Sequence, residues 1–310
     1  MTLNVLFAAR PDRWDSYEAP LHQAFEDAAL DIDLRQSFAP DEVDYIIYAP
    51  NGPVSDFSPF TRCKAVLNLW AGVDQIVGNA TLTQPLTRMV DYGLEAGMRE
   101  WVIGHVMRYH LGLDAYITTQ DGVWAPKVPP LARERRIGIL GLGTLGQAVA
   151  DGLNAIGFQV SGWSRTAKEV DNVQTYSGED GLLEMLGTSD MVVLLLPDTP
   201  QTQNILNADR LALLPRGAYV INPGRGPLIE DAALIDALNR GQIAHATLDV
   251  FRQEPLPKDD PYWTHPSVTV TPHIASETRA STASEIIADN IKRSENGDAL
   301  RFLVDRARGY

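Results

Sequence analysis

The chain lacks the residues and runs that mark several classes of protein. Cys63 is the only cysteine in 310 residues, which rules out a disulfide framework within one chain and fits a reducing compartment. The longest aliphatic run, Met191 to Leu196, is too short to span a bilayer. Lys and Arg number 26 against 40 Asp and Glu, and the net charge of −14 repels the phosphates of nucleic acids and anionic lipids. We therefore expect a cytoplasmic protein with neither a nucleic-acid nor a membrane partner.

Several catalytic signatures are absent as well. No His-Glu-x-x-His or paired-cysteine spacing occurs, so we expect no metal site. No Gly-x-Ser-x-Gly occurs either, which argues against a serine hydrolase. The apolar stretch from Leu3 to Ala9 has no basic segment before it and ends at Arg10, so we expect a first strand there rather than a signal peptide.

Strand-like apolar runs alternate with helical patterns along the chain, which is typical of parallel sheets with helices on both faces. The predicted strands are Leu3–Ala8, Tyr45–Tyr48, Ala65–Leu69, 137–140, 158–163, 191–196, 218–222, 246–251 and 268–271. The predicted helices are 21–29, 95–117, 230–239 and 280–295. On the second of these, Gly97, Gly104 and Gly112 recur at spacings of seven and eight, which predicts close helix packing.

We predict an α/β protein with two doubly wound parallel-sheet domains. The six strand-like runs from Ile137 onward match a Rossmann dinucleotide-binding domain, residues 97–281. That domain is inserted into a flavodoxin-like substrate or lid domain, residues 1–96 and 282–310, to which the last helix returns the chain. The substrate is expected to lie in a cleft between the two domains.

The most informative motif follows the strand at 137–140. Gly141, Gly143 and Gly146 form Gly-x-Gly-x-x-Gly, and a helical pattern opens directly after them. The first glycine permits a tight turn, the second a close approach to a pyrophosphate, and the third close helix–strand packing. The helix N-terminus then offers free N–H groups and a positive dipole to the phosphates. We predict that Gly141, Gly143, Thr144, Leu145 and Gly146 bind a dinucleotide.

The end of the next strand distinguishes the two nicotinamide cofactors. A carboxylate there would bind the ribose hydroxyls and repel a 2′-phosphate. This chain has Ser164, Arg165, Thr166 and Lys168 instead, a set suited to a phosphate, with Arg165 able to bind it through two N–H groups. The alternative is a solvated basic turn. We predict NADPH/NADP as the cofactor, with NADH less favoured.

Three further segments lie at or just beyond the carboxyl ends of later strands, where ligands bind in doubly wound sheets. They are Asn222–Gly226, Leu248–Leu256 and Thr271–Ser276. Together with the glycine motif, and in this order and spacing, they resemble the D-isomer-specific 2-hydroxyacid dehydrogenases over nearly the whole chain. Within that family the chain is most similar to the glyoxylate/hydroxypyruvate reductase A branch, on its short N-terminal domain, its Trp-Ser-Arg-Thr segment and Trp70–Asp74.

The resemblance implies that Arg225, Glu254 and His273 are catalytic. The chemistry agrees, because reduction of a 2-keto acid needs a proton donor, a cation for the carboxylate and a hydride. Histidine suits the proton transfer near neutral pH, a carboxylate on its other nitrogen favours the protonated form, and arginine is a permanent charged clamp. Taken singly, each of the three could be a turn, cap or core residue.

Other site residues follow from the same resemblance. Asp249 maps to a position that faces the nicotinamide carboxamide. The remaining cofactor contacts are expected at Pro197, Thr202, Pro223, Gly224 and Ser276. The substrate is expected to contact Tyr48, Trp70, Ala71 and Gly72 besides Arg225 and His273. Backbone N–H groups at Ala71 and Gly72 would bind the substrate carboxylate, although a simple strand-to-helix turn is the alternative.

The implied function is an NADP-dependent enzyme that reduces small 2-keto acids, glyoxylate to glycolate and hydroxypyruvate to D-glycerate, with His273 as the proton donor. Two alternatives stay open. One is a dehydrogenase or reductase for larger 2-keto acids such as phenylpyruvate, because Tyr48 departs from the branch's usual tryptophan. The other is a non-catalytic NAD(P)-sensing, corepressor-like protein.

An irregular, proline-rich arm from Asp121 to Leu131 precedes the nucleotide-binding strand. An exposed tryptophan on such an arm, Trp124, is typical of a subunit contact. We therefore predict a homodimer. The alternative is that the arm folds back on its own chain.

Overall fold

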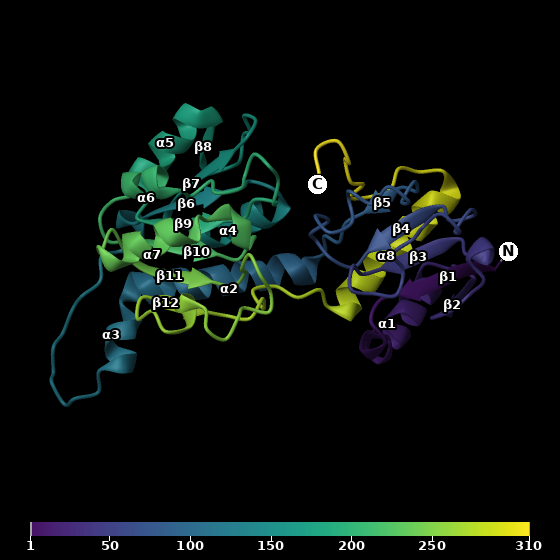
Figure 1. Ribbon diagram of the computed structural model, residues 1–310, viewed down its shortest axis with the longest axis horizontal. Coiled ribbons are helices and arrows are strands. Elements are labelled where there is room, and N and C mark those ends of the chain that lie inside the picture. The colour runs from purple at the N-terminus through teal and green to yellow at the C-terminus, as the bar shows by residue number, and fades with distance from the viewer. Residues whose placement is uncertain (1, 310) are drawn as a thin grey trace. The chain divides into compact units, whose positions relative to one another are not determined.

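A computed structural model describes residues 2–309, which divide into two compact units. One unit contains the chain up to Leu94 together with the segment from Thr278 onward, and the other is Glu95–Glu277. Figure 1 shows a parallel sheet with flanking helices in each unit. The predicted class, two doubly wound α/β domains with one inserted into the other, is confirmed.

The first unit is built on a five-stranded sheet with the order β2-β1-β3-β4-β5, in which every strand pair is parallel. This is the flavodoxin-like order. Its strands are β1 (Leu3–Ala8), β2 (Ile32–Arg35), β3 (Tyr45–Tyr48), β4 (Ala65–Asn68) and β5 (Leu86–Thr87). Its helices are η1 (Pro11–Arg13), α1 (Trp14–Asp27), η2 (Pro40–Glu42) and α8 (Ala280–Asn296). Helix α2 (Tyr92–Leu111) begins in this unit, and from Glu95 onward it belongs to the second unit.

Strand residues of this unit alternate between two buried faces. One face packs under α1 and α8, with a core that includes Phe7, Leu21, Ile47, Leu67 and Ile287. The other face packs under the loops that follow β3 and β4, with a core that includes Ile46, Val66, Phe57 and Ile76. Both faces of the sheet are therefore covered, which explains why every residue of β3 and β4 is buried and why all but Asn68, at the end of β4, are apolar or aromatic.

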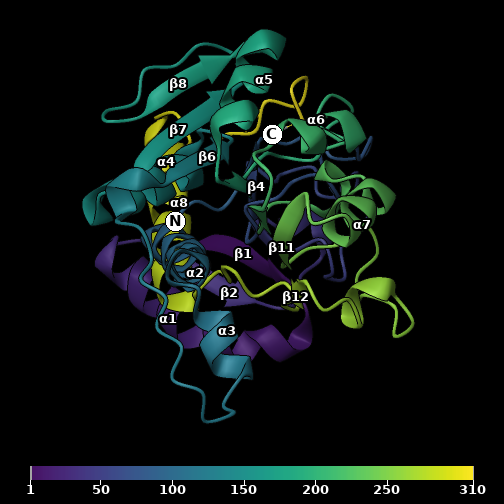
Figure 2. The same cartoon turned by 90° about the vertical axis from the view of Figure 1, so that its left-hand side faces the viewer.

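The second unit is built on a seven-stranded parallel sheet with the order β12-β11-β10-β9-β6-β7-β8. Strand order reverses between β6 and β9, which is the point where doubly wound sheets bind nucleotides. The strands are β6 (Arg136–Leu140), β7 (Gln159–Ser164), β8 (Gln174–Ser177), β9 (Met191–Leu194), β10 (Ala218–Asn222), β11 (Ile243–Leu248) and β12 (Val268–Val270). Figure 2 shows the helices of this unit on both sides of its sheet.

The helices of the second unit are α2, α3 (Leu113–Thr118), η3 (Ala132–Glu134), α4 (Thr144–Ile156), α5 (Gly178–Thr188), α6 (Ala208–Leu213), η4 (Gly226–Leu228), α7 (Asp231–Asn239) and η5 (Pro261–Trp263). Two cores lie on opposite faces of the sheet. One packs α2 and α4 against β6 and β9, and the other packs α5, α6 and α7 against the same sheet. The sheet's carboxyl edge is left for the loops that carry the predicted site.

Some predicted elements differ from the structure. Strands β2, β5 and β8 are absent from the prediction, so Tyr48 ends the third strand and not the second. The predicted helix 95–117 is two helices, because Gly112 adopts a left-handed φ of 65° and ends the first. Helix α1 begins at Trp14, seven residues before the predicted start, and β9 and β11 end at Leu194 and Leu248.

The close helix packing predicted from the glycines of α2 is wrong where the structure tests it. A Cβ atom built on Gly104 or on Gly112 would meet nothing within 4 Å. Gly104 is exposed, and Gly112 serves to end the helix. The packing role predicted for these two glycines is therefore wrong, whereas for Gly97, which is buried, it stays a prediction.

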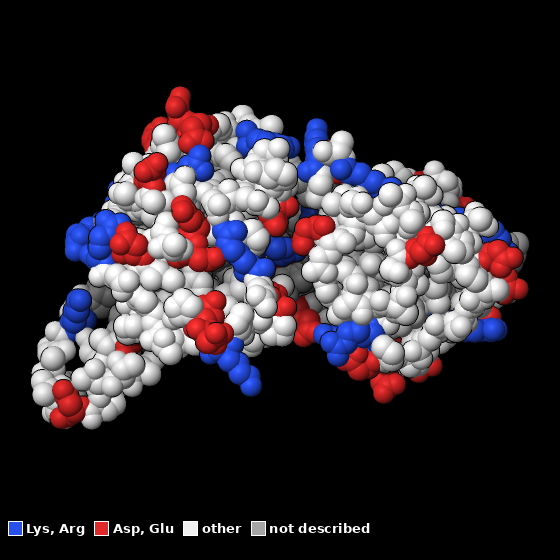
Figure 3. Space-filling view, in the orientation of Figure 1, with Lys and Arg blue, Asp and Glu red and all other residues white. Residues whose placement is uncertain are grey.

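Residues 119–131 form an arm without regular structure between α3 and η3, and Figure 1 shows it standing away from the body of its unit. Trp124 is 94% exposed and Val128 is 90% exposed. In Figure 3 the protruding arm is mostly uncharged surface. Within the described residues the arm therefore presents apolar side chains to solvent. Across residues 2–309, no helix combines the length and the apolar character needed to cross a bilayer.

Candidate active site

The glycine motif adopts the turn that its sequence predicts. Gly141 has φ +112°, and a Cβ there would lie 2.6 Å from the carbonyl oxygen of Leu195. A Cβ on Gly146 would lie 1.8 Å from the carbonyl oxygen of Gly141, so only glycine lets α4 approach β6 this closely. Gly143 has open space around its Cβ position. Gly141 and Gly146 thus allow the tight turn and the close packing of α4, while the absence of a side chain at Gly143 leaves space beside the loop.

The first turn of α4 is suited to an anion. No side chain caps the helix at Gly143, and the first N–H groups of an α-helix, here those of Thr144, Leu145 and Gly146, have no acceptor within the helix. Such N–H groups, at the positive end of the helix dipole, bind phosphate. The loop therefore fits a pyrophosphate.

The basic cluster after β7 is partly engaged with its own backbone. Ser164 is buried, and its hydroxyl donates to the carbonyl of Thr166 at 2.8 Å. The Lys168 ammonium donates to the carbonyl of Leu142 in the glycine loop at 2.9 Å. Arg165 and Thr166 are exposed. The cluster therefore lies against the glycine loop, where the adenosine end of a dinucleotide would place a 2′-phosphate.

Two loops beside the strand-order reversal are closely packed. The Thr202 hydroxyl donates to the carbonyl of Pro197 at 2.7 Å and accepts from the N–H of Thr199 at 2.9 Å, so it holds the loop after β9 in shape. Gly224 follows buried Pro223, and a Cβ on it would lie 2.7 Å from the carbonyl oxygen of Leu194. The loop after β10 thus packs closely against the end of β9.

Arg225 is presented by a turn that Asn222 stabilises. The Asn222 amide nitrogen donates to the Arg225 carbonyl at 2.9 Å, and its oxygen accepts from the N–H of Gly224 at 3.1 Å. The Arg225 guanidinium donates to the Gly224 carbonyl at 2.7 Å. Asn222 is almost fully buried, so its side chain serves this turn alone.

The turn that carries Arg225 packs against the loop that carries Glu254. A Cβ on Gly226 would lie 2.0 Å from the carbonyl carbon of Phe251. The Arg252 guanidinium donates to the carboxylate of Asp231 at 2.8 Å and to the carbonyl of Ile229. These contacts hold the loops after β10 and β11 together. Sequence motifs alone do not reveal Arg252 in this role, because its partners Asp231 and Ile229 lie more than twenty residues away in the chain.

Glu254 and His273 form a direct pair. The Nδ1 atom of His273 lies 2.7 Å from Oε2 of Glu254, while Oε1 of Glu254 accepts the N–H of Phe251 at 2.9 Å. About half of the His273 side chain is exposed. The Nε2 edge of the ring is therefore the one left for a substrate, because Nδ1 is engaged.

The electrostatics of the pair favour a protonated imidazole. The hydrogen bond that His273 donates to Glu254 raises the pKa of His273, against partial burial and against the nearby charge of Arg225. Partial burial raises the pKa of Glu254, but the hydrogen bonds from His273 and Phe251 and the charges of His273 and Arg225 outweigh it, so that pKa is lowered. Ionised Glu254 and protonated His273 thus stabilise each other.

Asp249 lies behind this pair. Its side chain has no exposed surface, and both carboxylate oxygens accept hydrogen bonds from the segment Thr271–Ala275. Ser276, one residue further, is partly buried and makes its own polar contact. The nicotinamide contact expected for Asp249 and the cofactor contact expected for Ser276 remain predictions.

In the first unit, the segment after β4 also has a buried amide behind it. The Asn68 amide nitrogen donates to the carbonyls of Trp70 at 2.9 Å and Gly72 at 3.1 Å. Among residues 2–309, no acceptor is recorded for the N–H groups of Ala71 and Gly72. Asn68 thus turns the loop carbonyls inward, which leaves the loop's N–H groups for an anion.

Tyr48, a predicted substrate contact, is buried in an apolar core of the first unit. It is 5% exposed at the end of β3, and its ring lies edge-on to Phe57 with a centroid distance of 5.3 Å. Burial raises the pKa of its hydroxyl. The ring belongs to the apolar core on that face of the sheet. Its predicted substrate contact stays a prediction, and so does that of Trp70, which is only partly buried.

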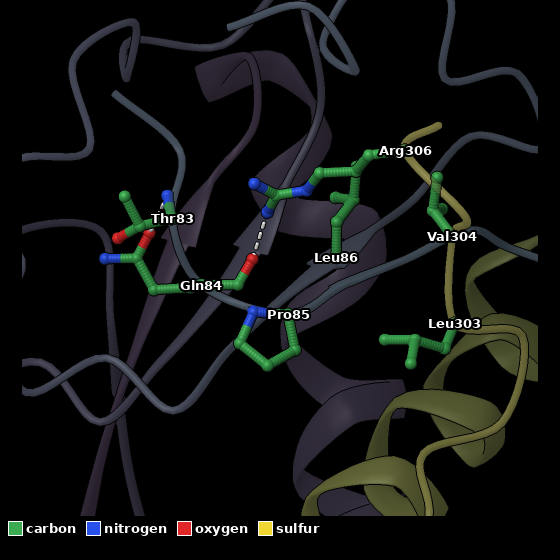
Figure 4. A pocket seen from close by; sticks show the side chains of 7 residues that line it. All are labelled: Thr83, Gln84, Pro85, Leu86, Leu303, Val304 and Arg306. Atoms are coloured by element: carbon green, nitrogen blue, oxygen red, sulfur yellow. Dashed lines mark hydrogen bonds between the residues drawn. The ribbon is translucent and has the colours of Figure 1, made fainter. Parts of the chain in front are cut away.

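Other features of the described residues offer no competing chemistry. No group of three or more His, Cys, Asp or Glu side chains in residues 2–309 is arranged to hold a metal ion. Cys63 is buried, and desolvation raises the pKa of its thiol to about 12. A shallow pocket of about 360 Å³ lies between β5 and the C-terminal segment, where Arg306 donates to the backbone of Gln84 (Figure 4). The guanidinium of Arg306, the cation that lines this pocket, thus already donates to backbone carbonyls of its own chain.

A glycine turn at the strand-order reversal, with an acid-supported imidazole at the same carboxyl edge of the sheet, defines a dinucleotide-dependent oxidoreductase. Residues 103–275 match the family model of the D-isomer specific 2-hydroxyacid dehydrogenase, NAD binding domain. The glyoxylate/hydroxypyruvate reductase A of Yersinia enterocolitica is 41% identical over 255 residues, which cover 80% of this chain and 82% of that protein. Its counterpart from Serratia proteamaculans is 42% identical over 257 residues with the same coverage.

Two solved structures are similar over the full length. The D-isomer specific 2-hydroxyacid dehydrogenase of Xanthobacter autotrophicus Py2, in complex with NADPH and MES, has a TM-score of 0.93 at 39% identity, with all of both chains covered. The NADPH-dependent glyoxylate/hydroxypyruvate reductase of Sinorhizobium meliloti, in complex with NADP and sulfate, has a TM-score of 0.87 at 33% identity, covering 100% of this chain and 99% of that one. The chain belongs to the D-isomer specific 2-hydroxyacid dehydrogenase family, in its glyoxylate/hydroxypyruvate reductase A branch, as its motifs predict.

Proposed function

We propose that this enzyme uses NADPH to reduce small 2-keto acids, glyoxylate to glycolate and hydroxypyruvate to D-glycerate. The 2.7 Å contact between His273 and Glu254, close to Arg225, carries the proposal. It supplies a proton donor and a cation at the carboxyl edge of a nucleotide-binding sheet. The names of the relatives support the substrate class.

Each catalytic side chain has one task in this proposal. Protonated His273 donates a proton from Nε2 to the carbonyl oxygen. Glu254 fixes the ring through Nδ1 and favours its charged form. Arg225 binds the substrate carboxylate and polarises the carbonyl. When bound, NADPH supplies the hydride that adds to the keto carbon, so the hydride and the proton together convert the ketone to an alcohol.

The cofactor assignment rests on the fit of two adjacent sites. The N–H groups that begin α4 receive the pyrophosphate, and Arg165 with Thr166 and Lys168 receives the 2′-phosphate. Pro197, Thr202, Pro223, Gly224 and Ser276 line the remainder of the cofactor site in this proposal, while Asp249, which is fully buried, accepts hydrogen bonds from the segment just before Ser276. Crystal structures of relatives in complex with NADPH or NADP support this choice.

The substrate carboxylate also needs neutral donors. We assign this task to the N–H groups of Ala71 and Gly72, which Asn68 orients. Trp70 and Tyr48 complete the substrate contacts in this proposal. Such donors bind the carboxylate without adding charge, and in this proposal Arg225 acts on both the carboxylate and the carbonyl.

A homodimer in the cytoplasm is part of the same proposal. The apolar arm at 119–131 is too exposed for an isolated chain, with Trp124 at 94%. Replacing Trp124 by Ser is expected to shift the protein from dimer to monomer in sedimentation velocity. A monomeric parent protein would contradict this assignment.

A substrate panel tests the function directly. We expect kcat/KM for glyoxylate and hydroxypyruvate with NADPH to exceed that for phenylpyruvate, and the values with NADH to be lower. A preference for phenylpyruvate would favour the larger-substrate alternative. The absence of turnover with every 2-keto acid would favour the nucleotide-sensing alternative.

A further inference from the structure

Four hydrogen bonds from the segment around His273 converge on one residue, Asp249. The carboxylate oxygen Oδ1 accepts from the Thr271 hydroxyl at 2.5 Å and from the Ile274 N–H at 2.9 Å. Oδ2 accepts from the Ala275 N–H at 2.8 Å. The Asp249 carbonyl accepts from the N–H of His273 itself at 2.9 Å. Donors on both sides of His273 are therefore tied to a single buried side chain and its backbone.

The backbone of His273 needs such restraint. Its φ is +55°, in the left-handed region that side chains other than glycine, asparagine and aspartate seldom adopt. Its own side chain is about half exposed and contributes little packing to hold it there. Strained backbone persists only where the surroundings impose it. Here the four hydrogen bonds to Asp249 are those surroundings.

We propose that Asp249 is the positioning residue of this site: it holds the segment Thr271–Ala275 in the left-handed turn that brings His273 to Glu254. The proposal rests on the proposed function for its kinetic consequences. Asp249 has no exposed surface, so a cofactor group can reach its carboxylate only if the backbone at 274–275 moves. Anchoring of the loop is therefore its first role.

Asp249→Asn tests the anchor with almost no change in shape. The amide nitrogen cannot accept a hydrogen bond, so at least one donor among Thr271, Ile274 and Ala275 loses its partner. We expect the amides of Ile274 and Ala275 to exchange with solvent about tenfold faster or more, because local opening becomes easier. We also expect kcat to fall on the order of a hundredfold, as for loss of a general acid, while the Kd for NADPH stays within about threefold of the parent value.

The titration of His273, followed by NMR of its ring protons without any ligand, gives a readout independent of activity. Glu254, Arg225 and Asp249 are the charged groups that face the ring. In the parent, Glu254→Gln is expected to lower the pKa of His273. In the Asp249→Asn background, the same change is expected to have little further effect, because the ring no longer meets Glu254.

Two further variants test whether the effects of Asp249→Asn come from lost hydrogen bonds to the His273 segment, and not from the lost charge or from a general loss of stability. Thr271→Val removes one donor and no charge, so it is expected to loosen the same amides and lower kcat to a smaller degree. Asp190→Asn removes a carboxylate that accepts the Arg136 N–H at 2.9 Å at the amino end of the sheet, and is expected to leave the His273 titration unchanged. If Asp249→Asn does not fold, Thr271→Val decides the question alone.

Opposite results overturn the proposal. A variant Asp249→Asn that keeps its His273 titration and its kcat, but binds NADPH about tenfold or more weakly, makes Asp249 a cofactor ligand and not an anchor. Unchanged amide exchange in both Asp249→Asn and Thr271→Val also refutes it. A parent protein that reduces no 2-keto acid refutes the proposed function, while titration and exchange still decide the role of Asp249.

Discussion

The ammonium of Lys168 donates to the carbonyl of Leu142 at 2.9 Å, which ties the basic cluster after β7 to the glycine loop after β6. In the proposed function the glycine loop serves both nicotinamide cofactors, whereas Arg165, which is exposed, serves only the 2′-phosphate of NADPH. We expect Lys168→Met to weaken binding of both cofactors, because the glycine loop loses its support, and to weaken NADPH more, because the 2′-phosphate also loses a cation. We expect Arg165→Ala to weaken NADPH alone, by about tenfold or more.

Fluorescence titration with each reduced cofactor measures both effects. Lys127→Met, on the exposed arm, is the matched control and is expected to leave both dissociation constants unchanged. A Lys168→Met protein that loses affinity for NADPH only would show that Lys168 acts through the 2′-phosphate and not through Leu142.

The parts of the site that follow from strand order are visible in the sequence. The carboxyl ends of parallel strands share one edge of a sheet, so Arg225, Glu254 and His273 are predicted together from three separate loops. The structure brings Glu254 and His273 within 2.7 Å of each other. Their catalytic roles stay predictions, whereas membership of the family is confirmed.

The strands and the helix end that the sequence did not predict lack a clear local pattern of apolar residues. Strand β2 has one buried residue, Leu34, and β8 has none, so neither shows an apolar period. The end of α2 at Gly112 depends on a left-handed turn that the surrounding helical pattern conceals. The hydrogen bonds of Asp249 and the left-handed φ of His273 arise from tertiary contacts between the segments that follow β11 and β12, which no local pattern encodes.

The pH profile of reduction should depend on Glu254. Its hydrogen bond raises the pKa of His273 above the ordinary 6.5, so protonated His273, and with it kcat/KM for keto-acid reduction, is lost only as pH rises through that raised value. Glu254→Gln is expected to move the falling limb of the profile toward 6.5. A limb that does not move in the variant would show that another group limits the reaction.

The same pair makes stability depend on pH in a defined window. The raised pKa of His273 gives a contribution that is present at low pH and lost as pH rises through the raised value. The lowered pKa of Glu254 gives a contribution that is present above its ordinary 4.5 and lost as pH falls through the lowered value. The difference in urea midpoint between the parent and Glu254→Gln is therefore expected to be largest between pH 4.5 and 6.5, and a difference that grows above pH 8 would contradict the pairing.

The two proposed substrate contacts, His273 and Arg225, should affect kcat and KM differently in steady-state kinetics. His273→Ala is expected to lower kcat on the order of a hundredfold or more with NADPH binding largely intact, because a general acid acts only in the transition state. Arg225→Ala is expected to raise KM for the keto acid as well as lower kcat, because its charge also contacts the ground state. His22→Ala, exposed on α1, is the control. Parent-like kinetics in either site variant would remove that residue from the mechanism.

Replacing Gly226, which takes no part in the proposed reaction, is expected to lower both the stability and the activity of the enzyme. A Cβ there would lie 2.0 Å from the carbonyl carbon of Phe251 and 2.4 Å from the nitrogen of Arg252, and both atoms are backbone that cannot swing aside. We expect Gly226→Ala to lower the free energy of unfolding by about 1–3 kcal/mol, as overpacking does, and to lower kcat because the Glu254 loop is pushed away from Arg225. Gly104→Ala, in open space on α2, is expected instead to raise that free energy by about 0.5–1 kcal/mol. Urea unfolding of the two variants in parallel checks both signs, and a neutral Gly226→Ala would mean that the loops after β10 and β11 are not held in contact.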